Sequence, residues 1–198
     1  MRIKELLDDM KTYIASGDWE GLEKHARKRC EKLAGKPQAA LIAELDMSAY
    51  VEQLEDTTRE VFESAEEHEA AAIVYEFEME NNWAGTFVVC PEYAPEEDED
   101  DDWANDCDEE IDGPDCPELA EFYEEGFDST EAELGVNAYL IARTVAAFGK
   151  CVETMPDSEF AVCIGYNDQE LFTRIREAEG RALDAVDEED EEEEDEEE

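Results

Sequence analysis

The chain has 198 residues and a formal net charge of −46, because 61 acidic residues face only 15 basic ones. A hydrophobic content of 42% is close to that of globular proteins, so most of the chain can bury a core. The negative charge argues against direct binding to nucleic acids or anionic membranes, and it points to a basic partner.

The N-terminal third is predicted to be helical, because apolar residues recur there at helical spacing. Three successive stripes are Ile3, Leu6, Leu7, Met10 and Ile14, then Trp19, Leu22, Ala26, Cys30 and Leu33, then Met47, Tyr50, Val51, Leu54, Val61, Phe62 and Ala65. Asp18 is the expected N-cap of the second helix. That helix carries most of the chain's one basic patch, from Lys24 to Lys36, which is expected to pair with the protein's own acidic surface.

The pattern changes period at residue 72. Tyr75, Phe77 and Met79 alternate with glutamates, which indicates a strand with one wet face. A second apolar run, 86–90, follows an Asn/Gly turn, so the two form a predicted β-hairpin. An acidic segment, 92–115, then leaves the sheet as a long loop.

The C-terminal half is predicted to contain three helices and one strand. Asp115 with Glu118, and Thr130 with Glu133, have the spacing of capping boxes. The second box opens a long central helix, 134–155, which Pro156 ends. The apolar run 160–166 is the candidate third strand. Asn167 and Glu170 are expected to cap a last helix, whose apolar face would hold Leu171, Phe172, Ile175 and Ala178.

The expected fold is therefore α+β, with a small antiparallel sheet (the hairpin plus a third strand) packed against several helices. Residues 1–186 form one domain into which the acidic loop 92–115 is inserted. The tail, 187–198, consists of acidic residues alone and is expected to be disordered, because it has nothing to bury.

The location is expected to be cytoplasmic. Charges at Lys4, Glu5, Asp8 and Asp9 fall where a signal peptide needs an apolar stretch. No run approaches the ~20 apolar residues of a membrane span. The six cysteines are scattered and are expected to be reduced, although the sequence leaves pairing of two of them, at 107 and 116, open.

No motif for catalysis, for a metal or for a cofactor is found, so we expect neither an enzyme nor a cofactor-binding protein. An EF-hand loop starting at Asp98 fails, because its sixth position is Trp103 instead of glycine. Zinc ligation lacks a Cys-x-x-Cys pair, and His25 and His68 lie in predicted polar helices.

The candidate site is the acidic loop together with the aromatic residues near it. Twelve of the seventeen residues from 96 to 112 are acidic, yet one is a tryptophan, which a solvated spacer does not need. Aromatic anchors among steering charges are typical of protein interfaces, although Trp103 could instead fold back and pin the loop. The expected partner-binding residues are Asp98, Asp100, Asp101, Asp102, Trp103, Asp106, Asp108, Glu109, Glu110, Tyr93 and Trp83.

The predicted function is that of an inhibitor that neutralises a basic protein, in its most concrete form an immunity protein or antitoxin for a cationic toxin. The alternatives are a DNA mimic, an acidic chaperone for basic proteins and an enzyme without a recognisable motif. A surface adapted to a halophilic host is a further explanation of the acidity. The partner's identity and the oligomeric state do not follow from the sequence.

Overall fold

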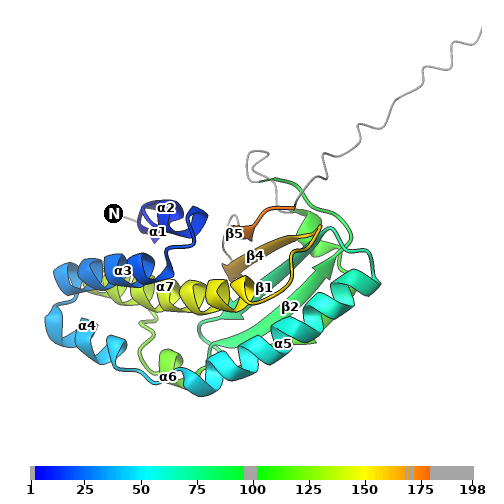
Figure 1. Cartoon of the computed structure of the whole chain (residues 1–198). Helices are drawn as coiled ribbons and strands as arrows, with labels where there is room; N and C mark the ends of the chain where they lie inside the picture. Colours follow the sequence, from blue (N-terminus) through cyan, green and yellow to red (C-terminus); the bar gives the residue numbers. More distant parts are fainter. Residues whose placement is uncertain (1–2, 96–101, 168, 170–171, 179–198) are drawn as a thin grey trace, which may run out of the picture.

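A computed structural model describes residues 3–95, 102–167, 169 and 172–178 (Figure 1). The N-terminal third is helical, as predicted, and consists of α1 (Ile3–Asp8), α2 (Lys11–Ala15), α3 (Trp19–Leu33), α4 (Lys36–Ala43) and α5 (Ser48–Glu67). Most residues of the three predicted stripes are buried. Asp18 is the N-cap of α3, and its carboxylate accepts a hydrogen bond from the backbone N–H of Gly21 at 2.9 Å.

The described strands form one five-stranded sheet in the order β3-β2-β1-β4-β5. They are β1 (Ala72–Glu78), β2 (Ala84–Cys90), β3 (Glu109–Asp112), β4 (Ala161–Tyr166) and β5 (Thr173–Arg176). The hairpin β1–β2 and the third apolar strand, β4, are confirmed. The prediction of an antiparallel sheet is wrong, because β4 runs parallel to β1 while the other pairs are antiparallel.

Two elements differ from the prediction. The expected last helix is β5 instead: Ile175 faces the main core, and pairing with β4 decides against the helical spacing. The acidic segment is not all loop, because it contains a short 3-10 helix, Asp102–Asn105, and the edge strand β3. The predicted box of Asp115 and Glu118 is also absent, since Cys116 precedes the short helix α6 (Pro117–Ala120) without a side-chain cap.

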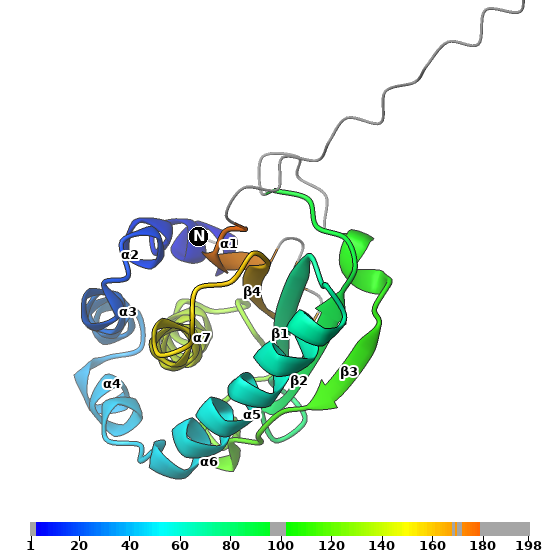
Figure 2. The ribbon, with the colours of Figure 1, turned by 45° about the vertical axis from the view of Figure 1, so that its right-hand side comes forward.

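The long helix α7 (Glu131–Glu153) lies at the centre of the molecule, as its broad apolar stripe predicts. Figure 2 shows it nearly end-on, with α3 and α4 on one side and the sheet on the other. Its capping box is formed, because Glu133 N–H donates to Thr130 Oγ1 at 3.2 Å and Thr130 N–H donates to Glu133 Oε2 at 2.8 Å. Gly149 in this helix faces the Trp19 ring, which would clash with any larger side chain, so α3 packs closely on α7.

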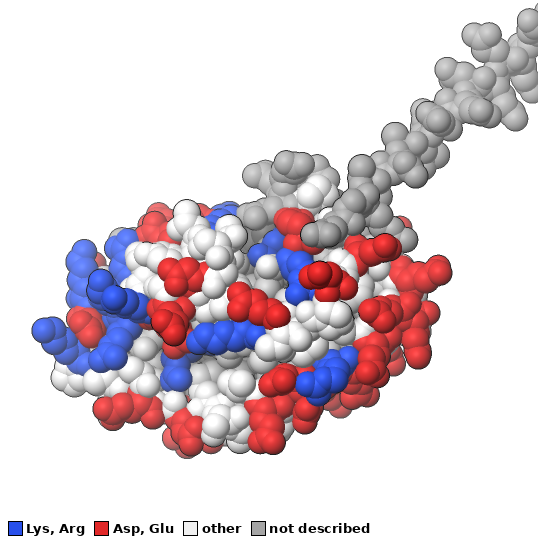
Figure 3. All heavy atoms as spheres, in the orientation of Figure 1, with Lys and Arg blue, Asp and Glu red and all other residues white. Residues whose placement is uncertain are grey.

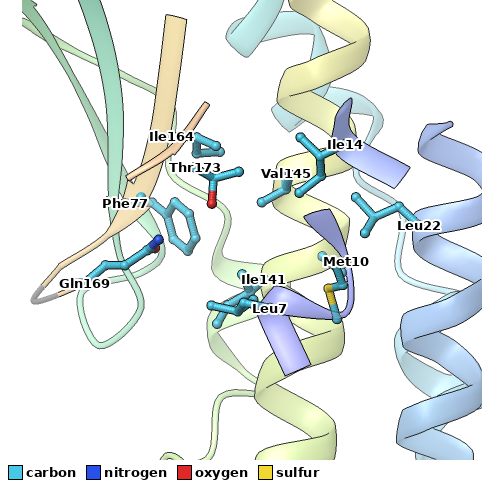
Figure 4. A pocket seen from close by; sticks show the side chains of 12 residues that line it. Leu7, Met10, Ile14, Leu22, Phe77, Ile141, Val145, Ile164, Gln169 and Thr173 are labelled. Atoms are coloured by element: carbon cyan, nitrogen blue, oxygen red, sulfur yellow. The ribbon is translucent and has the colours of Figure 1, made fainter. Parts of the chain in front are cut away.

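The two faces of the sheet differ. One face packs on α5 and α7 through the main core, to which Tyr75, Phe87 and Ile164 belong. Figure 4 shows a small pocket on this side, lined by residues of the sheet and of α7 that include Phe77, Ile164, Ile141 and Val145. The opposite face, called the outer face below, carries a smaller apolar cluster around Val74 and Cys163. No helix within the described part of the chain has the length and apolar character needed to cross a membrane.

Candidate protein-interaction site

The acidic segment is fixed to the outer face of the sheet by aromatic residues. The Trp103 side chain is only 8% exposed and packs with Val74, Cys90 and Cys163 in the smaller cluster. Its ring meets the Tyr93 ring edge-on, with ring centroids 5.3 Å apart. Trp103 therefore folds back onto its own sheet, the arrangement that the sequence left open for this residue.

Arg174 of β5 completes this arrangement. Its guanidinium carbon lies 5.8 Å from the centre of the Tyr93 ring and 5.9 Å from that of Trp103, which places a cation over both rings. It also donates hydrogen bonds to the Ala94 carbonyl at 3.0 Å and the Phe172 carbonyl at 2.7 Å. We call Tyr93, Trp103, Phe172 and Arg174 the anchor cluster.

The anchor cluster lies beside described residues that are close in the sequence to the two dense acidic blocks. Residues 96–101 are all acidic, and the described residues on either side of them, Ala94 and Trp103, belong to the same small cluster. Ala178, the last described residue before the acidic C-terminal segment, packs there as well. The described residues that flank the first block and the last described residue before the second therefore lie together on the outer face, although about 80 residues separate them in the sequence.

The described part of the segment, 102–112, presents carboxylates to solvent. Exposed acidic side chains here are Asp102, Asp106, Asp108, Glu110 and Asp112, and Glu109 is half-buried and accepts a hydrogen bond from Ser64. Arg176 of β5 donates hydrogen bonds to the carbonyls of Val152 and Pro156, and it forms no ion pair with a carboxylate among the described residues. The described part of the segment therefore forms an exposed acidic surface.

Strand pairing extends the acidic surface across the sheet. Thr86 of β2 pairs with Asp112 on one side and with Glu76 of β1 on the other, so all three side chains lie on one face. Because Glu110 is two residues from Asp112 on β3, it lies on the same outer face. The anchor cluster covers the other end of this same face.

Trp83 does not belong to this surface. Its side chain has no exposed area, it stacks on Phe77 with ring centroids 5.4 Å apart, and its indole N–H donates to Thr144 Oγ1 at 2.9 Å. It is a core residue at the hairpin turn and is not accessible to a partner in this structure. Asp98, Asp100 and Asp101 lie outside the described residues.

Burial shifts the pKa values of ionisable groups at and near the site. Burial, together with a hydrogen bond to Glu177, raises the pKa of the Tyr93 phenol, so that it stays neutral. All six cysteines are free, and burial raises the pKa of Cys90 to about 12. Within the described residues, no group of three or more His, Cys, Asp or Glu side chains is placed to hold a metal ion.

Sequence reasoning missed a row of carboxylates on α5. Five exposed acidic residues lie three or four residues apart on one face of the helix: Glu52, Asp56, Glu60, Glu63 and Glu67. Figure 3 shows red side chains gathered over this helix. The helical spacing of these five residues is present in the sequence, but the denser acidic runs at 96–112 and 187–198 were the stronger signal. Arg174 was also missed, because nothing local indicates that it lies against residues 80 positions away.

Comparison of the chain with protein-family models, with curated proteins and with solved structures gives no significant match.

Proposed function

We propose that the protein binds and neutralises a basic protein, in the manner of an immunity protein or antitoxin that blocks a cationic toxin. The observation that carries this proposal is the smaller apolar cluster, which holds Ala94, Trp103 and Ala178 together on the outer face, each close in the sequence to a dense acidic block. A binding surface needs its charges concentrated and held in place, because steering raises association rates by about 10- to 1,000-fold when fields from several charges add.

The rigidity of the described segment also supports binding. Arg174 ties Ala94 and Trp103 to the sheet, and β3 ties residues 109–112 to β2. Carboxylates held by regular structure lose less conformational freedom on association than the same charges on a free chain. The expected partner surface is a cleft lined by Lys and Arg, of the kind that nucleases use for phosphates.

Co-expression tests the proposal directly. Each reading frame adjacent to this gene is expressed alone and together with this chain. We expect one neighbour to encode a basic protein that arrests growth alone and is tolerated when the chain is present. If every adjacent product is harmless alone, or if the chain fails to relieve the arrest, the toxin form of the proposal is wrong.

A matched pair of variants locates the binding surface. Glu110→Gln with Asp112→Asn removes two charges from the outer face. Glu20→Gln with Glu44→Gln instead removes one charge from the first turn of α3 and one from the C-cap of α4. Stopped-flow measurement with the neighbouring basic protein should show the first pair slowing association several-fold more than the second. Equal effects would mean that only net charge matters. An on-rate that does not change with salt would contradict electrostatic steering altogether.

The row on α5 favours a second candidate, a DNA mimic that blocks a DNA-binding protein. Its five carboxylates span fifteen residues, which is about 22 Å of helix, so one charge falls every ~6 Å. One strand of duplex DNA carries a charge every ~3.4 Å, so the row has about half that density. Neutralising Glu60 and Glu63 should weaken the complex strongly if the row on α5 mimics DNA, and should leave it almost unchanged if Glu110 and Asp112 make the contact.

A further inference from the structure

This acidic molecule carries a basic ridge at the end opposite the acidic surface over α5. Its members are exposed side chains from α3 and the start of α4: Lys24, Arg27, Lys28, Lys32 and Lys36. Figure 3 shows blue side chains gathered where α3 meets α4, away from the red surface over α5. Residues 24–36 hold six basic residues against one acidic residue, a formal charge of +5 in a chain of −46.

The protein's own described surface leaves most of this ridge without a counter-charge. Arg27 pairs with Glu31 at 3.3 Å, and the neighbouring Arg29 pairs with Asp9. Lys24, Lys28, Lys32 and Lys36 make no ion pair with any residue that the structure describes, although acidic residues outnumber basic ones four to one. The expectation that this patch pairs with the protein's own surface therefore holds for the arginines and fails for the lysines.

We propose that the ridge binds the acidic C-terminal segment of its own chain, residues 187–198. Twelve carboxylates there face a ridge of charge +5, so the two are complementary. The segment lies outside the described residues, but its attachment is known: the description ends at Ala178, in the smaller cluster on the outer face. Twenty residues follow, and they reach at most ~65–70 Å when extended, which exceeds the ~40 Å diameter of a domain of this size.

Other occupants are less favourable. A nucleic acid would have to approach a chain of charge −46, and a second copy of the chain would meet the same repulsion. A tethered segment is instead present at an effective concentration of the order of millimolar. In the free protein, binding to the ridge covers the lysines and holds the acidic segment on the molecule, and a more basic partner then competes for that segment.

Carbodiimide cross-linking of the full-length chain tests this contact, because the reagent joins a lysine to a carboxylate only when the two touch. Trypsin cleavage after Arg181 releases residues 182–198 as one acidic peptide without lysine. We expect this peptide to be linked to Lys24, Lys28, Lys32 or Lys36 at ~0.01 M salt, and to lose those links at ~1 M salt, where the Debye length is ~3 Å. The pair Lys150–Glu23, 2.8 Å apart, is the internal positive control.

Three results would overturn the proposal. One is the Lys150–Glu23 link without any link from the ridge to the acidic peptide. Another is linkage of the acidic peptide to Lys4 and Lys11 as often as to the ridge. The third would come from a mixture of ¹⁵N-labelled and unlabelled chains. If the links from the ridge join only different copies of the chain, the contact is intermolecular.

A charge-neutral variant gives an independent measurement. Each Asp in 187–198 is changed to Asn and each Glu to Gln, so the length of the chain is kept. Acetylation of the four ridge lysines should then become several-fold faster, while that of Lys150 stays the same. Unchanged acetylation of the ridge would show that nothing covers it in the native protein.

Discussion

Replacing Trp103 with alanine removes the aromatic centre of the anchor cluster. A tryptophan side chain buries about 200 Å², and at ~25 cal/mol per Å² this corresponds to ~5 kcal/mol. Because a compact unfolded chain already covers part of that surface, the expected loss in the free energy of unfolding is ~3 kcal/mol. The edge-on contact with Tyr93 and the cation of Arg174 over the ring are lost as well.

Urea unfolding followed by circular dichroism measures this loss, and the thermal midpoint should fall by roughly 6–12 °C. Trp103→Phe is the matched control: it keeps a ring beside Tyr93 and Phe172 and should cost only ~1 kcal/mol. A loss below ~0.5 kcal/mol for the alanine variant would refute the packing argument, since that is the range of surface substitutions.

A second readout separates anchoring from a general loss of stability. The chain has three tryptophans, so 5-fluorotryptophan labelling should give three ¹⁹F resonances, and Trp103→Phe assigns one of them. The Trp103 resonance should shift little between H₂O and D₂O, as expected for a side chain that is 8% exposed. A shift as large as that of free 5-fluorotryptophan would mean that the segment 102–112 is not held on the sheet.

Three further outcomes follow from buried polar groups and thiols. Cys107 is the one exposed cysteine, so a thiol reagent should label it first in the native protein, and mass spectrometry of the digest checks the position. Thr144→Val leaves the indole N–H of Trp83 without its acceptor and should cost about 1–3 kcal/mol in urea unfolding. Burial raises the pKa of Tyr50, which shares a buried 2.9 Å hydrogen bond with Tyr75, well above the unfolded value of ~10. Folding thus favours the neutral phenol, so the contribution of Tyr50 to stability is fully present below pH ~10 and is lost as the pH rises beyond it, as denaturation at stepped pH of the native chain and of Tyr50→Phe would show.

The helices could be predicted from the sequence because their signals are local. The stripe from Trp19 to Leu33 and the capping box at Thr130 each depend on residues within a few turns, and both appear as expected. The same local reasoning failed at 172–178, where Phe172 and Ile175 have helical spacing. There the unpaired edge of β4 offers backbone hydrogen bonds, and strand pairing overrides the spacing.

The candidate site was predictable only in part, for a related reason. A tryptophan among carboxylates correctly indicated that Trp103 has a structural role, because its ring stabilises the protein only when it is buried. The partner that holds it, Arg174, comes from the other end of the chain and follows no local rule. Trp83 looked equally anomalous in a turn, but its neighbours in space are Phe77 and Thr144 of the core. Anomalous residues are therefore detectable in a sequence, whereas the direction in which they point depends on the tertiary fold.

The anchor cluster and the basic ridge both bear on how the chain stays folded despite its net charge of −46. Two carboxylates ~10 Å apart in water repel by ~0.4 kcal/mol, and a chain with 61 acidic and 15 basic residues contains many such pairs. Self-repulsion therefore opposes the compact state, and we expect a bound basic protein to relieve it. Added salt should accordingly stabilise the free protein while it weakens the complex, because screening removes the repulsion in one and the attraction in the other. These opposite signs are what distinguish a surface built to bind a cationic partner from an acidic surface that serves only to stay hydrated.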